Sequence, residues 1–304
     1  MLDVLVHLVI VVAFPPLLPG IIAKVKGVMG GRVGPPILQP YFDLFRLMRK
    51  GTVLSQSTTW MFLAGPVVGI STCMIASVLL PLGHHDAPVS FSGDLVLFVY
   101  LLALGRFVLS LSSLDTGSAF EGMGVAREVT YACLAEPALI AGLMVCAKLS
   151  GSIRLADMLG GHLPTDWRMG IAPLALVGVS WFIVLLAENC RIPFDDPNTH
   201  LELTMIHEVM VLDHGGPALG LILYGASMKM FLFVAVLVRL AVPWNTGVAA
   251  IEWIIFLLAS MTIAVVIGLV ESSMARLRLL RVPVLLVVAC IMSAFGLILV
   301  SSPL

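Results

Sequence analysis

The chain has 304 residues, of which 60% are hydrophobic and only 12% are charged, and its mean hydropathy is +1.07. This balance excludes an ordinary soluble domain and predicts an all-α, polytopic integral membrane protein that forms one domain over residues 1–304. The net charge of −1 excludes the concentrated basic face that binding of nucleic acid requires.

Eight apolar runs are long enough to cross about 30 Å of hydrocarbon as helices. They cover residues 2–22, 61–83, 94–114, 131–149, 170–188, 217–240, 252–271 and 283–302. We expect the first run to be a retained helix rather than a cleaved signal peptide, because it has no basic segment before it and contains Pro15, Pro16 and Pro19.

Residues 36–50, after the first run, have the spacing of an amphipathic helix. Its apolar stripe consists of Leu38, Tyr41, Phe42, Phe45 and Met48, and its polar face of Gln39, Asp43, Arg46 and Lys50. We expect this helix to lie in the membrane interface, with its polar face toward lipid headgroups or a docked protein. A simple surface anchor would show the same pattern.

Several ionisable residues lie inside the expected spans, where an unpaired charge is costly. They are Arg106, Glu136, Lys148, Glu188, Lys229 and Glu271. Lys148 and Glu271 lie near helix ends and are expected to reach the membrane boundary. Arg106 and Lys229 lie nearer the span centres and need a carboxylate partner, for which Glu136 is the natural candidate. A structural ion pair and a proton relay are both compatible with this pattern.

A charged loop, residues 188–216, follows the fifth span. Its ionisable residues include Glu188, Arg191, Asp195, Asp196, His200, Glu202, His207 and Glu208. The histidines at 200, 207 and 214 are about 10.5 Å apart along a helix, too far for two of them to bind one ion. Val211 stands where an H-E-x-x-H motif needs its second histidine, so we predict no metal site. A chain of histidines and carboxylates facing a wet cavity fits better, because such groups exchange protons near neutral pH.

Lysine and arginine are distributed unevenly between the loops. The loops after spans one, three, five and seven hold eleven of them, whereas the opposite loops hold only Arg154 and Arg168. The positive-inside rule then places the charged loop in the cytoplasm and both chain ends on the outer side.

The motifs that catalysis or cofactor binding would need are missing. The five cysteines contain no C-x-x-C pair, which indicates neither a disulfide framework nor an iron–sulfur ligand set. There is also no phosphate-binding glycine motif and no nucleophile beside a base in a recognisable motif. We therefore expect no catalytic residue and no bound cofactor in this chain, and we expect any redox cofactor to lie on another one.

Three motifs resemble the subunit 1 family of respiratory complex I. Residues 32–43 match its pattern R-x-G-P-x-x-L-Q-x-x-x-D, residues 188–195 match E-x-x-R-x-P-F-D, and Arg127 and Glu136 match an arginine and a carboxylate nine residues apart. Within that family the chain is most similar to the membrane subunits of formate hydrogenlyase and hydrogenase-4 type complexes. This similarity is carried by residues 114–118, 126–128 with 136–137, and 271–279.

The resemblance implies a subunit of the cell inner membrane that couples ion movement to electron transfer and does not itself catalyse. Its partners would be hydrogenase-like large and small subunits, iron–sulfur proteins and antiporter-like membrane subunits, with iron–sulfur clusters and a nickel–iron centre on those partners. The candidate proton-coupling residues are Glu136, Glu188, Asp195, Asp196, Glu202, His200, His207, Glu208, Lys229 and Arg106. The candidates for the cavity and the peripheral-arm interface are Arg32, Gln39, Asp43, Asp115, Arg127, Glu128 and Arg191.

One departure from the family pattern affects the choice of acceptor. Complex I subunits continue P-F-D-x-P-E-A-E-x-E-L, whereas here Asn198 and His200 replace the first two of those glutamates and Asp196 is an added acid. A hydrogenase-type complex needs no quinone and suits this loop, and a quinone-binding subunit of an NADH- or other donor:quinone oxidoreductase is the alternative. A stand-alone ion transporter and a passive membrane anchor are the alternatives from other classes.

Overall fold

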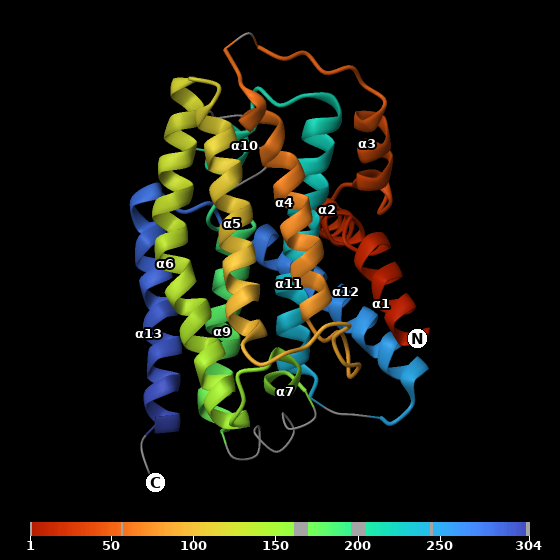
Figure 1. Ribbon diagram of the computed structural model, residues 1–304, viewed down its shortest axis with the longest axis vertical. Helices are drawn as coiled ribbons and strands as arrows, with labels where there is room; N and C mark the ends of the chain where they lie inside the picture. The colour runs from red at the N-terminus through yellow and green to blue at the C-terminus, as the bar shows by residue number, and fades with distance from the viewer. Residues whose placement is uncertain (1, 56, 161–169, 196–204, 244–245, 302–304) are drawn as a thin grey trace.

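Helices make up all the regular structure of the described residues, which are 2–55, 57–160, 170–195, 205–243 and 246–301 of a computed structural model (Figure 1). The elements are α1 (Leu2–Ala13), α2 (Leu17–Met29), α3 (Gln39–Met48), α4 (Trp60–Leu79), α5 (Asp94–Leu114), α6 (Ala119–Ser150), α7 (Leu155–Met158), α9 (Ile171–Glu188), α10 (His207–Met210), α11 (Gly216–Ala241), α12 (Ala249–Ser273), the 3-10 turn η1 (Leu279–Arg281) and α13 (Val282–Ser301). The predicted all-α class is confirmed.

Seven of the predicted spans are present as single long apolar helices among the described residues: α4, α5, α6, α9, α11, α12 and α13, the last entered through η1. Their ends agree with the predicted ranges to within four residues, except at the start of α6. The chain is therefore a multi-pass membrane protein.

The first predicted span, residues 2–22, is not one straight helix. α1 ends at Ala13, α2 begins at Leu17, and the two helices meet at an angle of 48°. Pro15 and Pro16 lie at the break, where their missing N–H groups and fixed φ prevent the helix from continuing. Counted as one broken span, α1 and α2 bring the number of candidate spans among the described residues to eight.

α6 begins twelve residues earlier than predicted, at Ala119 instead of residue 131. Its 32 residues span about 48 Å at 1.5 Å each, more than the hydrocarbon thickness. The polar first turns, which looked like a loop in the sequence, form the part of α6 that packs against α10. A Cβ at Gly124 would lie 2.3 Å from a Val209 methyl group, so glycine is needed for this contact.

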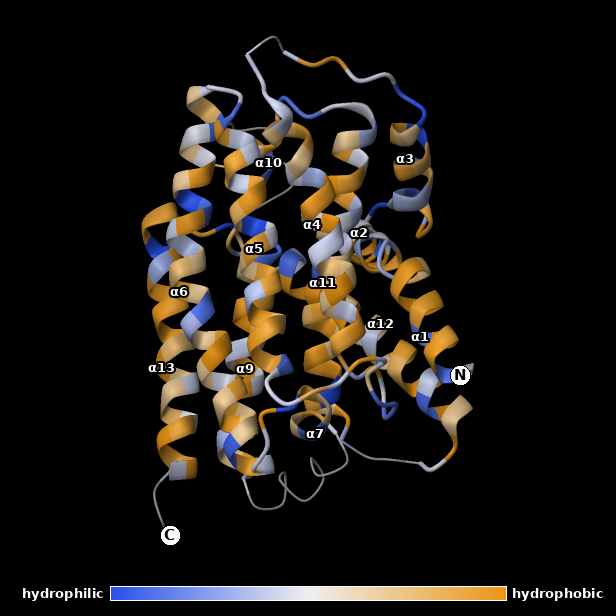
Figure 2. Ribbon diagram, in the orientation of Figure 1, coloured by the Kyte–Doolittle hydropathy of each residue, from blue (hydrophilic) through white to orange (hydrophobic). Residues whose placement is uncertain are grey.

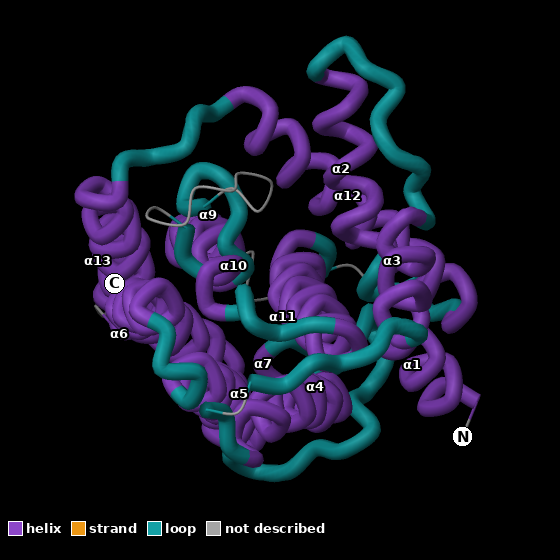
Figure 3. The backbone as a smooth tube through the Cα atoms, turned by 90° about the horizontal axis from the view of Figure 1, so that it is seen from above, coloured by secondary structure: helices purple, strands orange, loops and turns teal. Residues whose placement is uncertain are grey.

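α11 occupies the middle of the bundle, with α9, α4, α5 and α12 around it when the molecule is seen from above (Figure 3). α11 has 26 residues and is the most buried of the candidate spans, because 67% of the residues in its most apolar 18-residue stretch are buried. A charged residue on α11 therefore faces protein or a cavity rather than lipid.

The two ends of the bundle differ. One end carries α3, α10 and the segments 189–195 and 205–215, and we call it the charged-loop end; α7 and the loop 80–93 lie at the opposite end (Figure 1). Asp3 lies 3.7 Å from His85 of that loop, and Lys148 at the end of α6 donates a hydrogen bond to Ser301 at 2.7 Å. Both ends of the described chain are therefore remote from the charged-loop end.

α3 agrees with the predicted amphipathic helix, although it covers Gln39–Met48 rather than residues 36–50. Its apolar stripe is unusually open, since Phe42 is 62% and Phe45 is 59% exposed. The long helices are also hydrophobic over most of their length (Figure 2), and many of their large hydrophobic side chains are exposed. This exposure is the pattern expected of surfaces that contact lipid or partner membrane proteins.

Candidate functional site

A cavity of about 450 Å³ lies between α2, α3, α4, α5 and α11, and its lining includes Arg191, Asp195 and His207 of the charged-loop end. Its walls are largely apolar, with Ile22, Ile70 and Ile222 among the lining residues. Charged groups from separate helices gather on the remaining side, among them Glu188 and Lys229. An apolar recess with a few convergent polar groups is the usual form of a ligand site.

Four ionisable side chains from four helices form a continuous series of ion pairs, which we call the charge chain. Lys229 Nζ of α11 lies 2.7 Å from Glu188 Oε2 of α9, and Arg106 Nη2 of α5 donates to the same oxygen at 3.2 Å. Arg106 Nη1 then donates to Glu136 Oε1 of α6 at 2.9 Å. Two cations and two anions balance, which makes these charges tolerable between helices.

The charge chain runs from the cavity to the side of the bundle. Glu188, Lys229 and Arg106 line the cavity, and their side chains are 5%, 19% and 10% exposed. Glu136 does not line it, and 34% of its side chain is exposed. The expectation that Arg106 and Lys229 need carboxylate partners is confirmed, although Lys229 pairs with Glu188 rather than with Glu136.

Close packing of α4 on α5 helps to position Arg106. A Cβ added at Gly105 would lie 2.5 Å from Thr72 Oγ1, and one at Gly65 would lie 2.4 Å from Ser112 Cβ. Only glycine at these two positions allows the backbones to approach so closely. The residue next to Gly105 is therefore held at a fixed depth beside α9.

A second buried carboxylate lies at the end of α12. Glu271 Oε2 is 2.9 Å from Lys26 Nζ and its Oε1 is 3.5 Å from Arg191 Nη1, and its side chain is fully buried. Glu271 lies near a helix end, as expected, but its carboxylate is paired with two cations from distant segments inside the fold and does not reach solvent. Lys148 does lie at an exposed helix end, as expected.

Asp195 fastens the segment after α9 to its neighbours. Its carboxylate lies 2.8 Å from Arg276 Nη2 and accepts a hydrogen bond from the Ile206 backbone N–H at 2.7 Å. Arg127 supports the same region from α6, where its Nη1 donates to the Met205 carbonyl at 2.7 Å. These contacts hold two parts of the charged loop next to the cavity.

The other sequence-predicted site residues divide into three groups. Those that also line the cavity are Asp43, Glu128, Arg191, His207 and Glu208. Those that lie elsewhere are Arg32, exposed in the loop after α2, Gln39, which donates to Asp43 at 3.0 Å, and Asp115, which accepts at 2.6 Å from the N–H of Thr59, the N-cap residue of α4. Those outside the described residues are Asp196, His200 and Glu202.

Sequence reasoning missed several buried acids. Glu121 is fully buried and accepts hydrogen bonds from the Thr116 hydroxyl and from Asp213 N–H at 3.1 Å. Asp94 is also fully buried and accepts from Leu155 N–H at 2.7 Å. Asp94 at the first turn of a span was a visible helix-start signal, whereas Glu121 lay in a stretch that looked like a loop.

His207 and His214 do not share a site, in agreement with their sequence spacing. His214 stacks on Phe62 with ring centroids 4.0 Å apart, and its Nε2 lies 3.2 Å from Ser112 Oγ. Burial lowers the pKa of His214 below its ordinary value of 6.5. His207 instead lies at the cavity beside Glu128 and Cys190.

The NADH dehydrogenase family matches residues 2–302 of the chain. Formate hydrogenlyase subunit 4 of Escherichia coli (strain K12) is 30% identical over 283 residues, which are 90% of each chain. Hydrogenase-4 component C of the same organism is 32% identical over 284 residues, covering 91% of this chain and 89% of the relative. An NADH-quinone oxidoreductase subunit of Anaplasma phagocytophilum (strain HZ) is 28% identical, and the match covers 71% of this chain and 68% of the relative.

Among solved structures, a chain of the membrane-bound sulfane sulfur reductase, an archaeal respiratory membrane complex, shares the fold. Its TM-score is 0.85 over 99% of both chains, with 20% sequence identity. The resemblance indicated by the sequence motifs is confirmed by these relatives.

Proposed function

The chain belongs to the NADH dehydrogenase family, in which it is a complex I-like membrane subunit, and from this premise we propose that it couples electron transfer to ion translocation. It would anchor a peripheral arm of the hydrogenase type, made of hydrogenase-like subunits and iron–sulfur proteins, to antiporter-like membrane subunits. The translocated ion would be a proton or a sodium ion. The charged-loop end would face the cytoplasm and both chain ends the outer side of the cell inner membrane.

The charge chain supports this function most directly. It begins at a cavity lined in part by residues of the charged-loop end, where a peripheral arm would dock, and it ends at the partly exposed Glu136 of α6. Arg106 contacts both carboxylates, Glu188 at 3.2 Å and Glu136 at 2.9 Å. A change of charge at Glu188 would therefore alter how strongly Arg106 holds Glu136, without any large movement.

The coupling step follows from electrostatics. An electron that reaches the peripheral arm adds negative charge beside the cavity, which favours uptake of a proton by Glu188. Protonated Glu188 attracts Lys229 and Arg106 less, and Arg106 then interacts more strongly with Glu136. The charge signal would pass to the neighbouring membrane subunit at Glu136. Each of these steps is a redistribution of charge among groups already in contact.

The decisive experiment measures the ratio of translocated ions to electrons. The complete complex carrying Glu136→Gln would be reconstituted in liposomes with its own donor and acceptor. We expect electron transfer to continue and ion translocation to fall at least about fivefold, because Arg106 loses its charged partner on the flank. Glu136→Asp should restore part of the translocation, and Glu121→Gln, a buried glutamate of α6 outside the charge chain, is the matched control. A normal ratio in Glu136→Gln with the complex assembled would contradict the proposed coupling.

Co-purification identifies the partners. We expect a gentle detergent pull-down of this chain to recover antiporter-like membrane subunits together with iron–sulfur and nickel-bearing proteins, identified by mass spectrometry and metal analysis. Recovery of the chain alone would contradict the proposed complex.

The cavity supports quinone binding as a second candidate function. Its apolar walls and charged side match an amphiphile with a polar ring and an apolar tail, and one relative is a subunit of an NADH-quinone oxidoreductase. Photolabelling of the complex with an azidoquinone tests this function. We expect labelled peptides from α2, α4 or α11 if quinone binds, and labelling that excess quinone does not compete would contradict it.

A further inference from the structure

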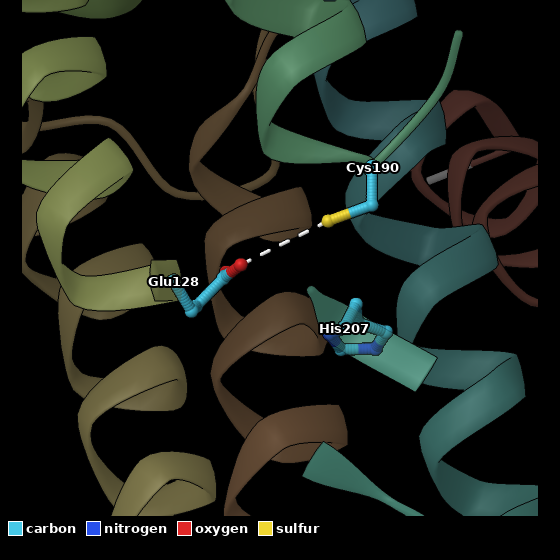
Figure 4. Close-up of side chains that lie close together, drawn as sticks. All are labelled: Glu128, Cys190 and His207. Atoms are coloured by element: carbon cyan, nitrogen blue, oxygen red, sulfur yellow. Dashed lines mark hydrogen bonds between the residues drawn. The ribbon is translucent and has the colours of Figure 1, made fainter. Parts of the chain in front are cut away.

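Three side chains with metal-binding atoms meet at the cavity. Glu128 of α6, Cys190 of the turn after α9 and His207 at the start of α10 point toward one another (Figure 4). One ligand atom from each lies within 4.8 Å of the other two, and Cys190 Sγ is 3.8 Å from Glu128 Oε2. We propose that Glu128, Cys190 and His207 form a binding site for a zinc-type divalent cation.

The distances fit this kind of ion. Zn²⁺ binds sulfur at about 2.3 Å and nitrogen or oxygen at about 2.0–2.2 Å in a tetrahedron, so its ligand atoms lie about 3.3–3.8 Å apart. The sulfur-to-oxygen distance of 3.8 Å is already at the upper end of that range, and the remaining pairs, which lie within 4.8 Å, need to contract by up to about 1.5 Å to reach it. Thiolate, imidazole and carboxylate are also the ligand types that zinc prefers over magnesium or calcium.

The fold brings the three ligands together from separate segments. Cys190 has φ +48°, a left-handed conformation that is uncommon for a residue with a side chain and is held here by its surroundings. The turn is fixed on both sides, because Cys190 N–H donates to the Ala187 carbonyl at 3.1 Å and Arg191 N–H to the Leu186 carbonyl at 2.9 Å. The side chain of Cys190 is thereby directed at α6.

The electrostatic setting suits a cation bound to the thiolate. The carboxylates of Glu128 and Asp195 act on the Cys190 sulfur more strongly than the ammonium group of Lys229 does, so a cation beside the sulfur is favoured. A cysteine side chain is mostly in its thiol form at neutral pH when no metal is bound. Binding of Zn²⁺ replaces that proton, which is released to water, and the Sγ–Zn bond forms with the thiolate lone pair. The carboxylate of Glu128 offsets the charge of the ion.

Access to the site comes through the cavity, since all three residues line it. Glu128 and Cys190 are buried, whereas His207 is half-buried. Three protein ligands leave the fourth position of a tetrahedral zinc ion for water, and that position would face the cavity. The spacing of His200, His207 and His214 predicted no metal site. The proposed site could not be found from such a spacing, because its ligands are 62 and 17 residues apart in the sequence.

The test uses the full-length chain purified in detergent and stripped of metal with a chelator. Titration with Zn²⁺ should show one ion bound per chain, and Cys190→Ser should weaken that binding at least about tenfold. Mutation of residues that only hydrogen-bond to a metal ligand already lowers metal affinity by about tenfold or more. His207→Gln should behave in the same way. Cys73→Ser, a second buried thiol that lines the same cavity, is the matched control and should bind as the unaltered chain does.

A measurement on the unaltered chain keeps the test independent of variant folding. Co²⁺ in place of Zn²⁺ should produce a near-ultraviolet thiolate-to-metal absorption band that Zn²⁺ abolishes by competition. Absence of that band, or equal zinc affinity in the unaltered chain and a folded Cys190→Ser variant, would overturn the proposal. Both readouts are independent of ion translocation, so they separate this inference from the proposed coupling function.

Discussion

Removing one charge from the charge chain should cost far more stability than removing two opposite ones. Lys229 Nζ and Glu188 Oε2 are 2.7 Å apart, so their mutual attraction is about 6 kcal/mol at an effective dielectric constant of about 20. Desolvation of the two ions offsets most of it, at several kcal/mol per ion. The pair therefore contributes little net stability, whereas either ion alone would be a destabilising charge in the bundle.

The perturbation is a double-mutant cycle with Glu188→Gln, which keeps the size of the side chain, and Lys229→Met, which shortens it only by the terminal nitrogen. We expect each single substitution to lower the free energy of unfolding by about 3 kcal/mol, at the lower end of values for a broken buried pair, because Lys229 is 19% exposed to the cavity. The double variant retains Arg106 with Glu136 and is electrically balanced. It should lose about 1 kcal/mol or less, which is a smaller loss than that of either single variant.

The assay is equilibrium unfolding in mixed micelles with increasing dodecyl sulfate, followed by tryptophan fluorescence. Lys229→Arg, which keeps the charge, is the control and should lose less stability than Lys229→Met. If the single effects add to within about 0.5 kcal/mol in the double variant, the two residues do not interact energetically and the reasoning from the ion-pair geometry fails.

Two further predictions concern packing and pH. Gly142→Ala in α6 should lower the free energy of unfolding by about 1–3 kcal/mol, because the added Cβ would lie 2.3 Å from Trp181 Nε1. A Cβ at Gly122 in the same helix would meet no atom within 4 Å, so Gly122→Ala should be neutral or stabilising by up to ~1 kcal/mol. Equal melting temperatures for the two variants would refute this account. His214 has a pKa below 6.5 in the folded protein, so the unfolded chain binds more protons below that pH and stability should fall as the pH decreases from about 6.5. His214→Gln should flatten the pH dependence of the melting temperature between pH 5 and 7, and an unchanged slope would assign it to other groups.

The membrane spans could be predicted from the sequence because bilayer thickness sets the length of an apolar run, whatever the helix packs against. The same logic misplaced the start of α6, since polar residues outside the bilayer, such as Glu121 and Glu128, can continue a helix as easily as they form a loop. The bend at Pro15 and Pro16 had a visible local cause. Its angle depends on what α1 and α2 pack against.

The charge chain was only partly predictable. A charge inside a span implies a partner, which correctly brought Arg106 together with Glu136, but helix depth and rotation decide which carboxylate lies nearest to Lys229. Glu271 shows the same limit, because its partners Lys26 and Arg191 are far away in the sequence. Contacts between segments are not encoded in spacing along the chain.

The volume of the cavity has a consequence for how charge can persist within the bundle. A volume of about 450 Å³ has room for about fifteen water molecules at ~30 Å³ each. Water that filled it would screen the charges of Lys229, Glu188 and Arg106, which line the cavity. An apolar guest that displaced it would remove the screening, and each charge would then act on its neighbours more strongly. By thermodynamic reciprocity, a change in the charge state of these residues would also change the affinity of the cavity for such a guest.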